Sequence, residues 1–236
     1  MVATGLRLDL HNHTYFSPDG VMSPADLLRT ARANGLACLA VTDHNTVEGA
    51  LEALALAEAD PTLPRVIPGI EISTADGDVI GLYVQQTIPS GLSASDTIAR
   101  IRQQGGLVYL PHPYGVTRRG TIASSVRAQV ADQADVVEVL NGRSLSPLSV
   151  RNSQRLASGH AKAGGAGSDA HGSGEVGRAY VVVDRCPTRE SLVALVAAGV
   201  VRDGLHWHEY LLNWALQPMS GVTRFRRKWG RDLSRR

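Results

Sequence analysis

The amino-acid sequence predicts an α/β fold and, among α/β folds, a (β/α) barrel. Short apolar runs of about four to seven residues alternate with helical segments of about ten to fifteen residues, which is the pattern of βαβ units around a mainly parallel sheet. About seven such units occupy roughly 200 residues, and this arrangement suits a barrel better than a doubly wound sheet. No Gly-x-Gly-x-x-Gly pattern follows the first expected strand, which further argues against a dinucleotide-binding sheet.

The expected strands are apolar runs bounded by glycine, proline or polar residues. They cover residues 6–10, 36–42, 65–73, 79–84, 107–110, 136–140, 164–168 and 179–183. The second of them is almost continuously apolar, as expected of a strand that is buried on both faces. The dipeptide Asp76-Gly77, between the third and fourth strands, is a turn signal.

Helices are expected between these strands, over residues 24–34, 46–60, 95–104, 122–133, 148–163 and 189–198. Ser23 is placed to cap the first helix, with Pro24 in the first turn, where its missing N–H is tolerated. Thr46 is the expected cap of the second helix, and a further helix is expected over 205–216. Because no clear linker precedes about residue 203, we predict a barrel domain over 1–203 and a C-terminal helix with a basic tail over 204–236.

The composition, with 43% hydrophobic and 19% charged residues, is that of a globular domain and excludes a collagenous, low-complexity or wholly disordered chain. The net charge of +2 is unevenly distributed, because residues 221–236 carry seven Lys or Arg residues and one Asp, leaving a charge of −4 on the preceding residues. The body is therefore not a basic nucleic-acid-binding surface. The tail is either a solvated segment or a binding site for anionic lipid, RNA or a phosphate-rich partner.

Two cysteines, Cys38 and Cys186, are too few for a zinc ribbon or a disulfide framework. Cys38 lies in the apolar run 36–42, which predicts a buried, inert thiol. Residues 1–9 contain no extended apolar segment typical of a secretory signal. No stretch approaches the roughly 18–20 apolar residues of a membrane span. We therefore expect a protein of the reducing cytoplasm, without a membrane span.

Metal-binding side chains follow five of the expected strands at the point where each strand ends. The first strand ends in His11-Asn12-His13, whose two imidazoles point to the same face. The other strand-end residues are His44, Glu71, His112, Asp169 and His171. In a barrel such positions converge on the C-terminal face, and imidazoles with carboxylates but no thiolates suit Zn²⁺, Mn²⁺ or Fe²⁺. The ligands exceed the needs of one ion, which predicts two or more ions and favours phosphoester hydrolysis.

Six motifs occur in order along the chain: His-x-His, Ser-Pro-Asp-Gly, Thr-Asp-His, Pro-Gly-x-Glu, Pro-His-Pro and Ser-Asp-Ala-His. Together they resemble the PHP (polymerase and histidinol phosphatase) family over about residues 6–183. The resemblance implies a distorted (β/α)₇ TIM-like barrel of the PHP type, with the metal site at the C-terminal ends of the strands. It also implies two or three divalent metal ions (Mn, Zn or Fe) and the hydrolysis of phosphoesters.

The resemblance assigns ligands by matching motif residues. His11, His13, Glu71 and Asp169 would hold one ion, Asp19, His44 and His171 a second, and Glu71 with His112 a third. Asp19 stands where some members carry a histidine, and without the resemblance it reads as a turn residue. The implied catalytic residues are His11, His13, Glu71, His112, Asp169 and His171.

One position departs from the family pattern. Many members with three ions place a histidine in the strand after the glutamate, where this chain has Asp78 in Gly77-Asp78-Val79. Asp78 is either an oxygen ligand of the third ion or only a polar residue at the turn into the strand. In the second case Glu71 and His112 alone would form the third site, and a resting enzyme with two ions would result.

Arginines are the expected contacts of a substrate phosphate, because guanidinium groups donate paired hydrogen bonds. Arg143 follows a strand end, and Arg118 and Arg119 follow His112 by a short loop; each is either a phosphate contact or a surface residue.

Glu138 and Asn141 are candidates to support the ligands or the substrate. His160, within a predicted helix, is expected to have a packing or surface role. His206 and His208, two apart on a predicted helix, are not expected to chelate.

These observations predict a metal-dependent phosphoesterase that acts on a small phosphorylated metabolite or nucleotide through a metal-activated hydroxide. Nucleic acid is expected only as a substrate or as a partner of the basic tail. The alternative is a non-catalytic, metal-stabilised PHP module that acts in protein or nucleic-acid interaction. A metal amidohydrolase fits less well, because the two lysines, Lys162 and Lys228, fall away from the strand ends and offer no carbamate bridge.

Overall fold

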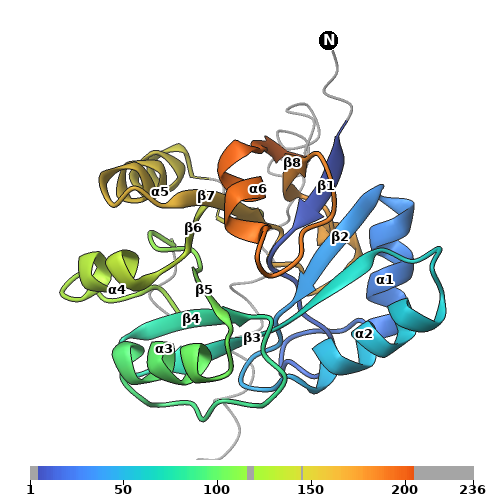
Figure 1. The fold of residues 1–236 in the computed structure, drawn as a ribbon, viewed down its shortest axis with the longest axis horizontal. Helices are drawn as coiled ribbons and strands as arrows, with labels where there is room; N and C mark the ends of the chain where they lie inside the picture. Colours follow the sequence, from blue (N-terminus) through green and yellow to red (C-terminus); the bar gives the residue numbers. More distant parts are fainter. Residues whose placement is uncertain (1–4, 116–119, 145, 205–236) are drawn as a thin grey trace, which may run out of the picture. The chain divides into compact units, whose positions relative to one another are not determined.

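The computed structural model describes residues 5–115, 120–144 and 146–204. Within them a sheet runs in the order β7-β6-β5-β4-β3-β2-β1-β8-β9. Its strands are β1 (Leu6–Asp9), β2 (Leu36–Val41), β3 (Arg65–Thr74), β4 (Gly77–Leu82), β5 (Leu107–Leu110), β6 (Val136–Asn141), β7 (Ala163–Gly167), β8 (Ala179–Val183) and β9 (Val200–Asp203). Figure 1 shows the sheet curling so that β7 returns towards β1.

The sheet closes almost completely where the ends of β1 and β7 meet. Leu10 N donates to Ala166 O at 3.1 Å, and Asp169 N donates to His11 O at 2.8 Å. One interior cluster draws buried side chains from each of the seven strands β1 to β7, among them Leu8, Ala40 and Tyr109. The predicted distorted, TIM-like barrel is therefore confirmed.

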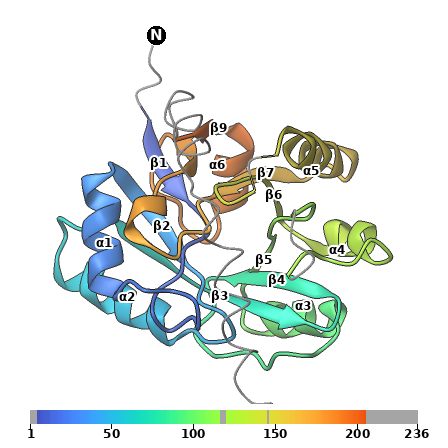
Figure 2. The same cartoon turned by 180° about the vertical axis from the view of Figure 1, so that it is seen from behind.

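The described residues contain six helices, of which the first five lie against the outer face of the sheet and the last packs against the interior cluster through Leu192 and Leu195 (Figures 1 and 2). They are α1 (Pro24–Ala33), α2 (Glu48–Ala59), α3 (Ala94–Gln103), α4 (Arg127–Gln133), α5 (Pro147–Gly159) and α6 (Leu192–Ala198), with a short 3₁₀ turn at Ser173–Glu175. Ser23 caps α1 as predicted, since its side chain accepts from Asp26 N at 3.0 Å. Thr46 is not the cap of α2, because Val47 holds that position; Thr46 Oγ1 accepts from Glu48 N at 3.2 Å from one residue further out.

Helix α4 begins at Arg127, five residues later than the sequence predicts. The residues before it are tied to the β3–β4 hairpin, because Ala123 N donates to Asp76 O at 2.7 Å. Ile122 is buried in the cluster beneath this hairpin. A tertiary contact thus replaces the first turn of the expected helix.

The sheet is less parallel than the sequence predicts. The pairs β1–β2, β2–β3, β5–β6 and β6–β7 are parallel, whereas β4 is antiparallel to both β3 and β5. The tight turn at Asp76-Gly77 explains this, because it leaves no room for the crossover that a parallel pair requires. Gly77 has a φ of 122°, and a Cβ there would lie 2.5 Å from Ile122 Cα. Strands β8 and β9 are also antiparallel to their neighbours, and the sequence did not predict β9.

The cysteines form a disulfide, so the prediction of a free, buried thiol at Cys38 is wrong. Cys38 in β2 is bonded to Cys186, 148 residues further along the chain, with a Cα–Cα distance of 6.0 Å. The segment that carries Cys186 also accepts a hydrogen bond at Pro187 O from Tyr83 and donates one from Arg189 to Gly105 O. The bond fastens this segment to the barrel. Because disulfides are rare in reducing compartments, the cytoplasmic location stays a prediction.

None of the helices in the described ranges is long and apolar enough to cross a membrane. The helix predicted over 205–216, the basic tail 221–236 and the histidines His206 and His208 lie outside the described residues, as do Arg118 and Arg119.

Candidate metal centre

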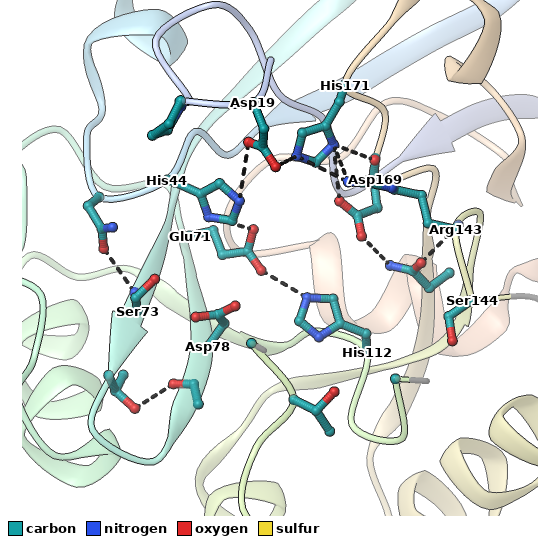
Figure 3. Close-up of a pocket in the computed structure, with 18 of the residues that line it drawn as sticks. Asp19, His44, Glu71, Ser73, Asp78, His112, Arg143, Ser144, Asp169 and His171 are labelled. Atoms are coloured by element: carbon teal, nitrogen blue, oxygen red, sulfur yellow. Dashed lines mark hydrogen bonds and ion pairs between the residues drawn. The ribbon is translucent and has the colours of Figure 1, made fainter. Parts of the chain in front are cut away.

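The C-terminal ends of the barrel strands surround a cavity of about 1010 Å³. Figure 3 shows the side chains that line it, with carboxylates and imidazoles facing one another across its floor. The candidate metal ligands in its wall are Asp19, His44, Glu71, Asp78, His112, Asp169 and His171. His11 and His13 are fully buried behind them. The structure therefore brings together every described residue that the sequence predicts to be a candidate metal ligand.

Four side-chain atoms form a cage of metal-ligand dimensions: His11 Nε2, His13 Nε2, Glu71 Oε2 and Asp169 Oδ1. The two imidazole nitrogens lie 3.0 Å apart, and they lie 3.1 and 3.2 Å from Glu71 Oε2 and 3.6 and 3.4 Å from Asp169 Oδ1. Ligand atoms about 2.1 Å from one ion lie about 3.0 Å apart in octahedral and about 3.4 Å apart in tetrahedral geometry. The observed separations fit an ion at the centre of this cage.

The hydrogen bonds behind His11 and His13 show which ring nitrogens face the cage. His11 Nδ1 lies 3.2 Å from Glu138 Oε1, a carboxylate oxygen that accepts a hydrogen bond from Nδ1–H. His13 Nδ1 lies 3.0 Å from Ser17 Oγ, whose own proton is donated to Asp43 Oδ1 at 2.7 Å. Both neutral rings would therefore point an Nε2 lone pair at the other ring across 3.0 Å. A cation between the two nitrogens removes this repulsion, so the donor set fits a metal ion.

In the metal-free protein, the neighbouring carboxylates favour protonation of these two rings. Burial opposes protonation of His13, but hydrogen bonds to Asp169 and Glu71 outweigh it and raise the pKa of His13 to about 9. Burial also opposes protonation of His11, and the charges of Asp169 and Glu71 again raise its pKa well above the usual value. Conversely, burial favours the neutral form of Glu71, but His11 and the neighbouring histidines lower its pKa. Glu71 is therefore held in its ionised form, which is the form that binds a cation.

A second group of candidate ligands lies beside the cage and consists of Asp19, His44 and His171; the three ligand atoms that lie within 4.8 Å of one another there belong to His13, His44 and His171. His171 Nε2 is 3.2 Å from Asp19 Oδ2, and His44 Nε2 is 3.8 Å from Asp19 Oδ1. Burial, followed by the positive charge of His13, lowers the pKa of His171, and burial lowers that of His44. Both rings are therefore held in the neutral form that binds metals. Asp19 is 56% exposed, so this group opens to the cavity.

Glu71 links this second group to the cage and to His112. Its Oε2 lies 3.3 Å from His44 Nδ1, and its Oε1 lies 3.0 Å from His112 Nε2. Ligand atoms of His11, Glu71 and His112 lie within 4.8 Å of one another and form a third candidate group. A carboxylate placed between three groups has the position of a bridging ligand.

Asp78 faces the same cavity from the first residues of β4, opposite Ser73 of β3. It is 7% exposed, and burial, followed by the charge of Glu71, raises its pKa to about 6. None of the candidate groups of three ligand atoms among the described residues includes Asp78. Its role as a ligand of a third ion stays a prediction.

Buried carboxylates hold the ligands from behind. Glu138 accepts from Tyr109 Oη at 2.9 Å, His112 N at 2.6 Å and Asn141 Nδ2 at 3.0 Å, besides its contact with His11. Asn141 Nδ2 also lies 3.2 Å from Asp169 Oδ2. Glu138 and Asn141 were candidates in the sequence; the structure places Glu138 behind the ligands and Asn141 in the cavity wall beside Asp169.

Sequence reasoning did not assign roles to Ser17, Asp43 and Asp9. Asp43 accepts from Thr14 N and from Ser17 Oγ, each at 2.7 Å, and Ser17 Oγ also accepts from His44 N at 3.0 Å. Asp9 accepts from Ser168 N at 2.9 Å. The available signal was alternation along the strand: Asp43 precedes His44 and therefore points away from the cavity into the protein.

Among the other predicted contacts, Arg143 lines the cavity, with Nη1 2.9 Å from His171 Nδ1. His160 lies at the end of α5 and pairs with Asp132 on the surface, at 2.5 Å, which agrees with the expected surface role.

Three of the five non-glycine residues with positive φ in the described ranges lie at the candidate site: Asn45, His112 and Asp169. Unusual backbone conformations of this kind concentrate at functional sites.

Metal binding is expected to release protons at pH 7. The pKa values of His13 and His112 are both raised to about 9, in each case against the effect of burial and through the neighbouring carboxylates. Both rings are therefore protonated in the metal-free protein, whereas a metal ligand must be neutral. Affinity for Mn²⁺ should rise with pH up to about 9. Calorimetry in buffers of different ionisation enthalpy measures the release, and heats that do not depend on the buffer would contradict the expectation.

Comparison with known proteins agrees with this geometry. The chain matches the PHP domain over residues 9–134 and the PHP-associated family over residues 147–201. It is 37% identical over 147 residues to an uncharacterized protein of Methanocaldococcus jannaschii, a match that covers 58% of this chain and 82% of the relative. It is 34% identical over 111 residues to the 3',5'-nucleoside bisphosphate phosphatase of Chromobacterium violaceum, covering 42% of this chain but only 37% of that enzyme.

A crystal structure with the same fold is that of a two-domain protein from Bacteroides vulgatus, which is described as containing a PHP-like metal-dependent phosphoesterase. Its TM-score is 0.67 at 18% identity, and the match covers 85% of this chain and 65% of that protein. The PHP domain match spans more than half of the chain, and the strand-end residues that carry the motifs meet in one cavity. The chain therefore belongs to the PHP domain family.

Proposed function

We propose that the protein is a metal-dependent phosphoesterase that hydrolyses the phosphomonoester or phosphodiester of a small phosphorylated metabolite or nucleotide. The observation that carries this proposal is the cage of His11, His13, Glu71 and Asp169, which shares Glu71 with a second ligand group. Two adjacent cation sites are the arrangement that enzymes use for in-line displacement at phosphorus. The bisphosphate phosphatase named among the relatives supports the same reaction class.

The ligand set suits two or three ions of Mn, Zn or Fe, because it combines imidazoles and carboxylates without a thiolate. His11, His13, Glu71 and Asp169 would hold the first ion, and Asp19, His44 and His171 the second. Glu71 and His112, with or without Asp78, would hold the third. Bound ions would supply a water of lowered pKa and positive charge to offset the charge that develops on phosphorus.

The protein's own residues bind and orient the substrate. Arg143 lies beside His171 at the edge of the second group, where its guanidinium can donate to a phosphate oxygen. We propose Arg118 and Arg119 as further contacts of the substrate phosphate. The cavity extends from the ligands to the β3–β4 hairpin, with Ser73, Thr74 and Thr121 in its wall, which leaves room for the rest of the substrate.

The test is a screen of the full chain, reconstituted with Mn²⁺, against phosphomonoesters, nucleoside bisphosphates and short oligonucleotides. We expect hydrolysis of at least one class, with loss of both bound metal and turnover in His13→Ala and Asp169→Ala. Protein that is loaded with metal yet inert towards the whole panel would contradict the proposal. If removal of the metal then also unfolded that inert protein, the non-catalytic module would be favoured.

A further inference from the structure

Asn45 directly follows the ligand candidate His44, at the point where the chain leaves β2. Its φ is 60°, a left-handed conformation that asparagine adopts more readily than most residues. Asn45 N donates to Glu71 O at 2.8 Å, and Glu71 N donates to Asp43 O at 3.1 Å. These two bonds form an isolated parallel bridge that pairs His44 with Glu71 beyond the end of β2.

A side chain makes the next step of this ladder. In a regular parallel pair, Ser73 N would donate to the main-chain oxygen of Asn45. Instead it donates to Asn45 Oδ1, at 2.9 Å. The side-chain amide therefore replaces the main-chain acceptor as the chain turns away, and it keeps the two segments joined on both sides of Glu71.

His44 depends on this backbone arrangement more than the histidines of the cage do. The Nδ1 atoms of His11 and His13 are fixed by Glu138 and Ser17. The Nδ1 atom of His44 is buried, and among the described residues it has no hydrogen-bond partner. It lies 3.3 Å from Glu71 Oε2. The main chain therefore decides how close the His44 ring lies to Glu71.

We propose that Asn45 is a positioning residue that sets the spacing of His44 and Glu71 and thereby the metal affinity of the group formed by Asp19, His44 and His171. This inference rests on the proposed metal centre and assigns to Asn45 a role that is separate from ligation. The relevant atom is Oδ1. An aspartate at this position keeps such an acceptor oxygen and should therefore preserve the function of Asn45, whereas a glycine keeps only the ability to adopt the left-handed backbone conformation.

The experiment measures Mn²⁺ binding to the full chain by calorimetry for Asn45→Ala, Asn45→Gly and Asn45→Asp. The class of sites lost in His171→Ala identifies the second group. We expect Asn45→Ala and Asn45→Gly to weaken that class by about tenfold or more, the range found when support of a metal ligand is removed. Asn45→Asp should stay within about threefold of the wild-type affinity or exceed it, because it keeps the acceptor.

Asn34→Ala is the matched control, because Asn34 also bonds a main chain through its side chain, from Nδ2 to Val176 O at 2.8 Å, but does not line the cavity. It should leave Mn²⁺ binding unchanged. Wild-type affinity in Asn45→Ala or in Asn45→Gly would overturn the inference, because neither variant keeps Oδ1, as would weak binding in Asn45→Asp, which keeps it. If Asn45→Ala does not fold, the glycine and aspartate variants decide. Wild-type protein that binds no Mn²⁺ would overturn the metal centre itself.

Discussion

Replacing Glu71 with glutamine is expected to abolish stable metal loading and to reduce hydrolysis by at least about 10³-fold, equivalent to about 4 kcal/mol of transition-state stabilisation. One Glu71 oxygen lies 3.1 to 3.3 Å from His11, His13 and His44, and the other lies 3.0 Å from His112. Glutamine has the same shape but carries no charge and offers only one acceptor oxygen. No candidate group would then keep its bridging carboxylate.

Metal content after dialysis and kcat/KM on the substrate found in the screen measure this effect. The matched control is Glu190→Gln, the same change at an exposed residue that pairs with Arg189 on the surface. Retention of all ions and of activity in Glu71→Gln would contradict the role of Glu71 as a shared ligand. Loss of both in the control would show that the charge change itself, and not the site, is responsible.

Replacing Glu138 with glutamine is expected to weaken metal binding at the cage by about 10- to 100-fold, although Glu138 is not itself a ligand candidate. Glu138 is 1% exposed and receives contacts from His11, Tyr109, His112 and Asn141. A glutamine would present an amide nitrogen to at least one of these donors. His11 would then lose the acceptor that keeps its Nε2 free for the cage.

The same substitution should lower the free energy of unfolding by about 1–3 kcal/mol, the usual cost of a buried polar group left without its partner. Chemical denaturation of the metal-free protein measures this loss, and metal titration measures the change in affinity. Glu52→Gln on the exposed side of α2 is the control and should change neither quantity. A stability loss with unchanged metal affinity would contradict a role of Glu138 in orienting His11.

The convergence of the ligand candidates could be predicted from the sequence because it follows from strand geometry alone. His11 and His13 share a face because side chains alternate along a strand, and Asp169 and His112 follow other strands of the same barrel. Parallel strands in a barrel end on one face. Local pattern therefore sufficed to predict which side chains meet, since the described candidates lie in the cavity wall or, for His11 and His13, are buried directly behind it.

The contacts that hold these side chains could not be predicted in the same way. The disulfide joins residues 148 positions apart, and no local pattern pairs them. Ser17 is recognisable only as part of a turn, yet its hydroxyl connects His13 to Asp43. Helix α4 lost its expected first turn because Ala123 is bonded to the hairpin. Each of these outcomes depends on which segments pack together.

The sequence by itself determined the alternation of strands and helices, the identity of the ligand candidates and the family to which the chain belongs. These follow from periodicity, turn residues and motifs, which are local properties of the chain. Only the tertiary structure decided the antiparallel placement of β4, the partners of the Nδ1 atoms of His11 and His13, and the use of Asn45 Oδ1 as an acceptor for Ser73. The physical reason is that a hydrogen bond or a ligand distance is set by atoms from distant segments, whose positions exist only after the barrel has closed.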